Sequence, residues 1–188
     1  NSWCYTDSLD YKSAAELVVS LIDAVSKNGN LLLNVGPRAD GSIAEHDREL
    51  LGAIGRWMRL NGEGIYGTRP WRITQEGPTK QDAGMFADQK PAEWTADDWR
   101  FTAKNGDIYA FCLNPVASVA PGGKLCLSTF AAYHDGIKPP FNGVVERVEQ
   151  LGAGAVAFER SKNGMSIIPL PRDSSMEELP VGFKITVR

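Results

Sequence analysis

The chain has 188 residues, of which 43% are hydrophobic and 23% charged, a balance typical of a globular protein with a buried core. Its formal net charge of −3 at pH 7 supplies no basic field, which counts against nucleic acid and anionic lipid as partners. The longest uncharged apolar runs, such as residues 31–33, fall far short of the ~20 residues of a membrane-spanning helix. Membrane and nucleic-acid roles are therefore not expected.

The sequence begins Asn1-Ser2-Trp3, with no initiator Met and without the basic and hydrophobic regions of a signal peptide. This start predicts a piece of a longer chain. Localisation therefore cannot be inferred from it.

The first predicted helix begins after Ser13, which forms a capping box with Glu16. It should end at Lys27-Asn28-Gly29, where a cation meets the negative helix end and a left-handed residue caps it. One apolar face recurs at helical spacing, through Leu17, Val18, Leu21, Ile22 and Val25.

A strand is predicted over residues 31–35, because an unbroken apolar run indicates burial on both faces, as in parallel α/β sheets. Gly36-Pro37 ends it. A second helix should begin with another capping box, Ser42 with Glu45, and end at Asn61-Gly62. Helix, strand and helix form an α/β unit whose single strand needs neighbours on both edges, so further strands are expected upstream.

From about residue 70 the pattern changes to short alternating strands, typical of a β-sandwich. One hairpin is predicted around Asn105-Gly106 and another at Asn163-Gly164. Further strands are expected over 124–129, 144–151 and the alternating end of the chain, where Phe183, Ile185 and Val187 share a face. The predicted fold class is thus α/β followed by all-β.

The three cysteines, Cys4, Cys112 and Cys126, show no C-x-x-C spacing and are interpreted as buried or half-buried thiols. A cross-strand disulfide between Cys112 and Cys126 is the alternative. The two histidines, His46 and His134, are far apart in sequence, so no metal site is predicted. His46 should lie in the first turn of the second helix, and His134 in a solvated turn.

Residues 62–67 match the pattern G-x-G-x-x-G, but they follow a helix and precede strands, which is the wrong context for dinucleotide binding. A helix end followed by a turn is the better interpretation. Glycoside hydrolysis needs a pair of carboxylates, but the acidic side chains of this chain are predicted to be solvated rather than catalytic: Glu45, Asp47 and Glu49 near a helix start, and Asp97-Asp98 and Glu177-Glu178 in polar loops.

Asn34 is a polar residue near the end of an otherwise apolar strand. In a β/α barrel the chemistry lies at the carboxyl ends of the strands, so Asn34 is a candidate for facing a pocket. Trp3 and Tyr5 belong either to the core or to a wall that faces a sugar, because aromatic rings stack on the apolar side of a pyranose.

Five segments, in this order, resemble the C-terminal half of α-L-fucosidases, the retaining glycoside hydrolases of the GH29 type. The resemblance is strong over residues 1–71 and weaker beyond. It rests on Ser2-Trp3-Cys4-Tyr5, Asn30-Leu31-Leu32-Leu33-Asn34-Val35-Gly36-Pro37, Asp40-Gly41, Ile54-Gly55-Arg56-Trp57 and Asn61-Gly62-Glu63-Gly64-Ile65-Tyr66-Gly67.

The resemblance implies that residues 1–67 are the last units of a (β/α)8-like barrel, with 31–35 as its final strand, and that 68–188 form a C-terminal antiparallel β-sandwich. It also implies removal of terminal α-L-fucose from glycans by double displacement, without a cofactor, between an Asp nucleophile and a Glu acid/base. Both carboxylates are expected upstream of Asn1, so no catalytic residue is assigned here and this piece alone should be inactive. Trp3, Tyr5 and Asn34 are the candidates for the pocket wall.

Cys4 stands where the family usually has Gly, and its side chain is expected to alter the local backbone or narrow the pocket. A secreted or periplasmic location is favoured, or a lysosomal one as in animal relatives. The piece is expected to expose Leu17, Leu21 and Ile22, and so to self-associate or bind the missing N-terminal half of the barrel. The alternative is a carbohydrate-binding or structural β-sandwich module with an N-terminal adaptor, since 70–188 look like the one self-sufficient core.

Overall fold

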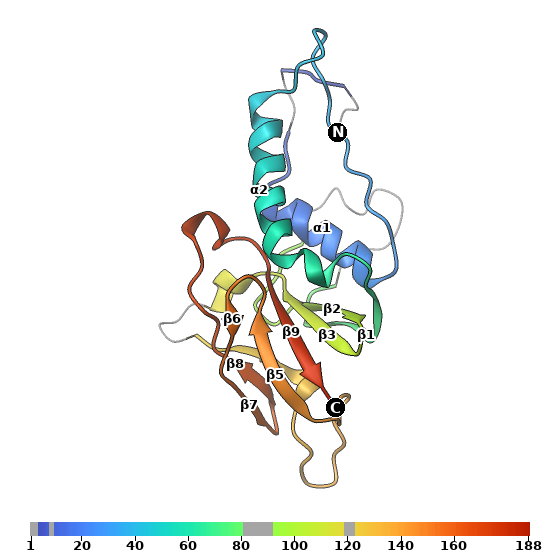
Figure 1. Cartoon of the computed structure of the whole chain (residues 1–188), viewed down its shortest axis with the longest axis vertical. Helices are drawn as coiled ribbons and strands as arrows, with labels where there is room; N and C mark the ends of the chain where they lie inside the picture. Colours follow the sequence, from blue (N-terminus) through green and yellow to red (C-terminus); the bar gives the residue numbers. More distant parts are fainter. Residues whose placement is uncertain (1–3, 8–9, 81–91, 119–122) are drawn as a thin grey trace.

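The computed structural model describes residues 4–7, 10–80, 92–118 and 123–188 (Figure 1). Within them, two helices precede nine strands. The helices are α1 (Ala14–Ser26) and α2 (Glu45–Asn61). The strands are β1 (Arg69–Glu76), β2 (Trp99–Lys104), β3 (Asp107–Cys112), β4 (Leu125–Leu127), β5 (Val145–Gln150), β6 (Gly154–Ala155), β7 (Phe158–Ser161), β8 (Gly164–Ile167) and β9 (Val181–Val187).

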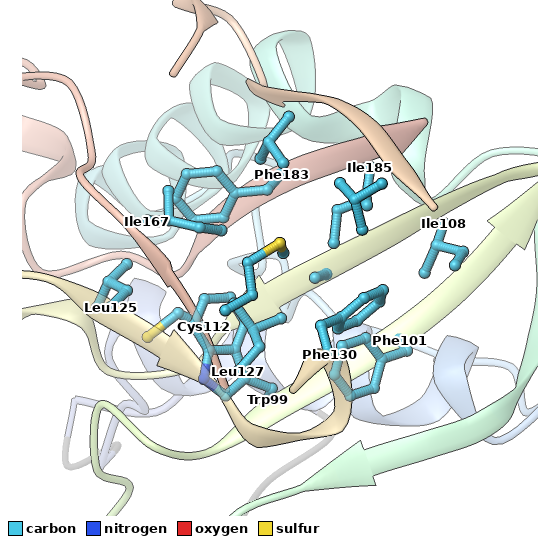
Figure 2. Close-up of a cluster of buried hydrophobic side chains, with 14 of the residues drawn as sticks. Trp99, Phe101, Ile108, Cys112, Leu125, Leu127, Phe130, Ile167, Phe183 and Ile185 are labelled. Atoms are coloured by element: carbon cyan, nitrogen blue, oxygen red, sulfur yellow. The ribbon is translucent and has the colours of Figure 1, made fainter. Parts of the chain in front are cut away.

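The strands form two antiparallel sheets. The larger one has the order β1-β2-β3-β9-β5-β6 and the smaller one the order β4-β8-β7. Figure 2 shows the apolar side chains that fill the space between the sheets, with Trp99 and Phe101 from β2, Phe183 from β9 and Ile167 from β8 among them. Two antiparallel sheets packed on a shared apolar core are a β-sandwich, as predicted.

The central strands of the larger sheet are buried on both faces, which gives the molecule a third layer. Trp99 and Phe101 of β2 point to the smaller sheet, whereas Arg100 and Thr102 point the opposite way and are equally buried. Alternation along a strand sends successive side chains to opposite faces. Figure 1 shows α1 lying across this second face.

A second apolar cluster joins the helices to that face of the sheet. Val18 and Ile22 of α1 and Trp57 of α2 pack with Tyr109 and Phe111 of β3. The prediction that Leu17, Leu21 and Ile22 would be exposed is therefore wrong, because the sheet covers this face of α1: Ile22 is fully buried and the two leucines are half-buried. Residues 70–188 are likewise not the one self-sufficient core, since their larger sheet is completed by the helices.

The first helix has the predicted ends. The Glu16 N–H donates to Ser13 Oγ at 3.2 Å, and the Ser13 N–H donates to Glu16 Oε2 at 2.7 Å, which completes the capping box. At the other end Asn28 takes the left-handed conformation with φ 63°, and the Gly29 N–H donates to the carbonyl of Ala24 at 2.7 Å.

The second predicted capping box is wrong. Ala44 occupies the N-cap of α2 without a side-chain hydrogen bond, because Ser42 is engaged in the preceding turn, where its N–H donates to Asp40 Oδ1 at 2.9 Å. The helix does end at Asn61, and the 3-10 turn η1 (Gly62–Gly64) follows it. The interpretation of 62–67 as a helix end and turn is confirmed.

Residues 31–35 do not form the predicted buried strand. They belong to neither sheet of the described residues, and Leu32 is 83% exposed. A strand is defined by hydrogen bonds to a neighbour, and an apolar run cannot become one without such a partner. In Figure 1 this stretch runs away from the sandwich, beside the N-terminal end of α2.

Both predicted hairpins are present. Asn105 (φ 54°) and Gly106 (φ 90°) connect β2 to β3 in a two-residue turn, as the primed turns of hairpins require. Ser161 pairs with Gly164 at the turn between β7 and β8. The thiols of Cys112 and Cys126 are free, the first buried and the second half-buried. Cys4 is exposed instead of buried.

Candidate functional site

The two N-terminal segments that resemble the fucosidases lie against each other. A Cβ added to Gly36 would lie 2.8 Å from Tyr5 N and 2.9 Å from the carbonyl carbon of Cys4. Only glycine permits so close an approach of two backbones. The end of the 31–35 stretch and the Cys4-Tyr5 pair thus form one local surface, although about thirty residues of sequence separate them.

Tyr5 is held at this surface by charged neighbours. Its hydroxyl donates to Asp7 Oδ1 at 3.0 Å, and the guanidinium carbon of Arg38 lies 4.8 Å from the ring centroid, within the range of a cation–π contact. The contact with Tyr5 raises the pKa of Arg38. Trp3, the third candidate, lies outside the described residues.

A cavity of about 200 Å3 opens beside this surface, between the 33–36 stretch and the two helices. Asn34 and Cys4 line it, whereas Tyr5 does not. Its other polar lining comes from Asp10, Tyr11, Lys12 and Asp47, and its apolar side chains are Leu17, Leu33, Val35, Leu50, Leu51 and Ile54. The lining is thus about evenly divided between polar and apolar side chains, so the cavity offers both hydrogen-bonding groups and apolar surface to a small ligand.

Tyr11 connects the two helices at the rim of the cavity. Its hydroxyl donates to Asp47 Oδ2 at 3.4 Å, and its ring meets the His46 ring edge-on at 4.3 Å. Partial burial, together with the Asp47 carboxylate, raises the pKa of Tyr11. His46 and Asp47 lie in the first turn of α2, as predicted.

The lining residues 10–12 were missed from the sequence. They immediately precede the capping box of α1, so they follow neither a strand nor a recognised motif. The available signal for a polar site was the run Asp10-Tyr11-Lys12 next to a helix start. It is weak, because such residues are common near helix starts.

The acidic residues outside this region serve the fold. Asp98 was expected to be solvated but is fully buried. Its burial is tolerated because the backbone N–H groups and hydroxyls of Thr79 and Thr95 all donate to its carboxylate at 2.7–3.0 Å. Burial alone would raise the pKa of Asp98, but these hydrogen bonds outweigh it and lower the pKa. Asp97 and the pair Glu177-Glu178 are exposed, as expected.

The described residues contain no group of three or more His, Cys, Asp or Glu side chains placed to hold a metal ion. His134 lies in a turn as predicted, but it is half-buried rather than solvated, and its Nδ1 lies 3.1 Å from the carbonyl oxygen of Ala132. Neither helix in the described part of the chain has the length and apolar character needed to cross a bilayer.

A family model described as Alpha-L-fucosidase matches residues 1–63. The tissue alpha-L-fucosidase of Mus musculus is 35% identical over 112 residues, covering 58% of this chain and 21% of that protein. The plasma alpha-L-fucosidase of Homo sapiens is 45% identical over 95 residues, covering 49% and 20%. The matched part thus spans about a fifth of the length of these curated relatives.

The likeness extends to the structure of nearly the whole chain. The Thermotoga maritima alpha-fucosidase, solved in complex with fucose, has a TM-score of 0.67 and 26% identity, and the match covers 98% of this chain and 37% of that one. The chain is thus similar to α-L-fucosidases in sequence, over residues 1–63 for the family model and over 112 residues for the Mus musculus enzyme, and in structure over nearly its whole length.

Proposed function

We propose that this chain is part of a retaining glycoside hydrolase that removes terminal α-L-fucose from glycans. The observation that carries the proposal is the family match over residues 1–63, the stretch that contains the Gly36–Tyr5 approach and all the residues that line the cavity. The fucose bound to the Thermotoga maritima relative supports a fucose-containing substrate.

Within that enzyme, residues 1–67 contribute the end of the catalytic barrel and residues 68–188 the β-sandwich. The exposed apolar stretch 31–33 then packs against barrel strands that the rest of the protein supplies. Asn34, which lines the cavity together with Cys4, is then part of the pocket wall. The continuous packing of α1 and α2 on the larger sheet argues against an independent binding module.

The nucleophile and the acid/base come from residues outside this chain. A retaining mechanism needs two carboxyl groups about 5–5.5 Å apart. Asp98 does not suit either role, because its carboxylate already accepts four hydrogen bonds from Thr79 and Thr95. The location that suits such an enzyme is outside the cytoplasm, secreted or periplasmic.

A panel of aryl glycosides tests the proposal on the full reading frame and on the 188-residue piece in parallel. We expect the full protein to cleave the α-L-fucoside and the piece to cleave none. Activity of the piece alone would show that the catalytic pair lies in this chain. If neither cleaves the α-L-fucoside, Cys4→Gly in the full protein is the next variant to assay, and failure of that variant as well would overturn the fucosidase proposal in favour of a binding module.

A further inference from the structure

Asparagine followed by glycine occurs five times in this chain, and this dipeptide can modify itself. The glycine main-chain nitrogen attacks the carbonyl carbon of the asparagine side chain: an N–C bond forms, the bond to the side-chain nitrogen breaks, and ammonia leaves with the glycine N–H proton. Water then opens the cyclic imide to aspartate or isoaspartate, so one water is consumed, one ammonia is released and no oxidant or reductant takes part. The pairs are Asn28-Gly29, Asn61-Gly62, Asn105-Gly106, Asn142-Gly143 and Asn163-Gly164.

The two pairs at helix ends are held by hydrogen bonds. The Gly29 N–H donates to the carbonyl of Ala24 at 2.7 Å, and the Gly62 N–H donates to that of Met58. Asn61 is also buried, and its side-chain amide donates to a backbone carbonyl at 3.1 Å. The attacking nitrogen is therefore engaged at both pairs, and at Asn61 the leaving group is engaged as well.

Two further pairs are held by packing. Gly164 is buried at the start of β8, where an added Cβ would lie 2.8 Å from the carbonyl oxygen of Leu127. Gly143 is half-buried, its carbonyl accepts a hydrogen bond from Arg160 at 2.7 Å, and an added Cβ would lie 2.7 Å from the ring of Phe141. The rotation that brings an asparagine side chain onto the following nitrogen would displace these close-packed neighbours.

The pair Asn105-Gly106 has neither restraint. Both residues are exposed in the turn between β2 and β3, with φ angles of 54° and 90°. Apart from its chain neighbours, no atom lies within 4 Å of a Cβ added to Gly106. Within the described residues, no hydrogen bond holds the Gly106 N–H or the Asn105 side chain. The attack therefore needs a backbone rotation that only the two-residue turn itself opposes.

The two products differ in their effect on this hairpin. Aspartate leaves the main chain unaltered and suits the same left-handed position. Isoaspartate instead carries the main chain through the former side chain, which lengthens the turn by one carbon. The turn sets the register in which Lys104 pairs with Asp107, so a longer turn disturbs the start of β3. This is the strand whose Tyr109 packs with the helices.

We propose that Asn105 is the self-modification site of the folded protein: it deamidates ahead of the other four asparagines that precede glycine, and its isoaspartate form has a weakened β2–β3 hairpin. The reaction uses water alone. The proposal is independent of the proposed glycosidase activity, because it depends only on the fold.

Peptide mass spectrometry of the full reading frame, after incubation in warm and mildly alkaline buffer, tests the order of reaction. The mass gain from amide to acid is followed at each pair, and chromatography separates aspartate from isoaspartate. The same protein unfolded in urea is the control, because all the pairs are then unrestrained. We expect Asn105 to react at least about fivefold faster than any other pair in the folded protein, the effect on a rate of one hydrogen bond. In urea the pairs should react at similar rates.

Two variants separate the effect of charge from that of the backbone. Asn105→Gly cannot react and keeps a residue suited to the turn, whereas Asn105→Asp carries the new charge on an unaltered main chain. We expect the melting temperature of the unsubstituted protein to fall during incubation as isoaspartate accumulates, and that of Asn105→Gly to stay constant. Freshly prepared Asn105→Asp should melt together with the fresh unsubstituted protein.

Equal conversion of another pair in the folded protein would overturn the site. So would folding that protects Asn105, relative to urea, as strongly as it protects the other pairs. A protein that contains isoaspartate at residue 105 and still melts together with Asn105→Gly would overturn the weakening of the hairpin.

Discussion

The indole Nε1 of Trp57 donates a hydrogen bond to the carbonyl oxygen of Pro180 at 2.7 Å. This bond ties α2 to the residue that immediately precedes β9, the central strand of the larger sheet. Trp57 is fully buried and packs its ring against Phe111 with centroids 5.9 Å apart. One side chain thus joins the stretch matched by the fucosidase family model to the sandwich by both apolar and polar contact.

Replacing Trp57 with Phe should cost more stability than the same change at Trp99. Both indoles are fully buried, but Trp99 Nε1 has no hydrogen-bond partner in the described part of the structure. Both substitutions remove the same ring volume. The difference between the two losses of unfolding free energy therefore measures the lost bond to Pro180 and the carbonyl left unpaired, about 1–2 kcal/mol. Urea unfolding measures both free energies. Equal losses would mean that this bond contributes nothing.

The ion pairs of Asp23 provide a second comparison. Its carboxylate meets Arg100, 3% exposed in the side chain, at 2.5 Å and Lys27, 44% exposed, at 2.7 Å. Asp23→Asn leaves the buried guanidinium without its anion, so a loss of about 3–5 kcal/mol is expected. Lys27→Met removes only the exposed partner and should cost less than about 1 kcal/mol. Similar losses for the two variants, measured by urea unfolding, would contradict this account.

Features written in local sequence were predicted well. The capping box of Ser13 and Glu16, the end of α2 at Asn61 and the turn at Asn105-Gly106 each depend on a few adjacent residues. The second capping box was predicted wrongly because Ser42 belongs to the turn before the helix, where its N–H donates to Asp40. The strand at 31–35 failed because periodicity reports burial, but strand formation also needs a partner whose presence no local pattern reveals.

The candidate site was predictable only in part. Asn34 was flagged by its polarity within an apolar run, and it lines the cavity. Tyr11 and Asp47 reach the same cavity because α1 and α2 pack side by side. This packing is a tertiary contact, and no sequence motif indicates it. The burial of Asp98 was missed for the same reason, since Thr79, one of its two partners, lies nineteen residues away in sequence.

Alkaline pH should destabilise the protein through Tyr109. Burial, and next the hydrogen bond that its hydroxyl donates to Glu63 at 2.8 Å, raise the pKa of Tyr109 to about 12. A tyrosine whose pKa in the folded state exceeds the ordinary value of about 10 stabilises the fold below pH 10 or so, and the stabilisation is lost as pH rises toward 12. The free energy of unfolding should decrease more between pH 8 and about pH 11 for the unsubstituted chain than for Tyr109→Phe. Parallel declines would count against Tyr109.

Acid should act through Asp98 in the opposite direction. The pKa of Asp98 is lower in the folded protein than the ordinary value, so the carboxylate stabilises the fold at neutral pH and this contribution is lost as pH falls below about 4. Asp98→Asn should therefore cost about 2 kcal/mol at pH 7 and progressively less in acid. Asp97→Asn is the control, because that neighbour is exposed and should change little at either pH. A deficit of Asp98→Asn that stays constant with pH would mean that hydrogen-bond geometry, not charge, matters.

Gly36→Ala should destabilise the protein, whereas Gly52→Ala should stabilise it. The new methyl group at residue 36 would meet the rigid backbone of Tyr5 at 2.8 Å, and relieving that overlap costs about 1–3 kcal/mol. At residue 52, inside α2, the nearest atom is the flexible end of Arg56 at 3.5 Å, so the higher helix propensity of alanine adds about 0.5–1 kcal/mol. In the full reading frame, if the cavity is the substrate pocket as proposed, Gly36→Ala should also raise the KM for an aryl α-L-fucoside, because Gly36, Cys4 and Asn34 line it, while Gly52→Ala leaves KM unchanged. A destabilised Gly36→Ala protein with an unaltered KM would place this surface outside the substrate pocket.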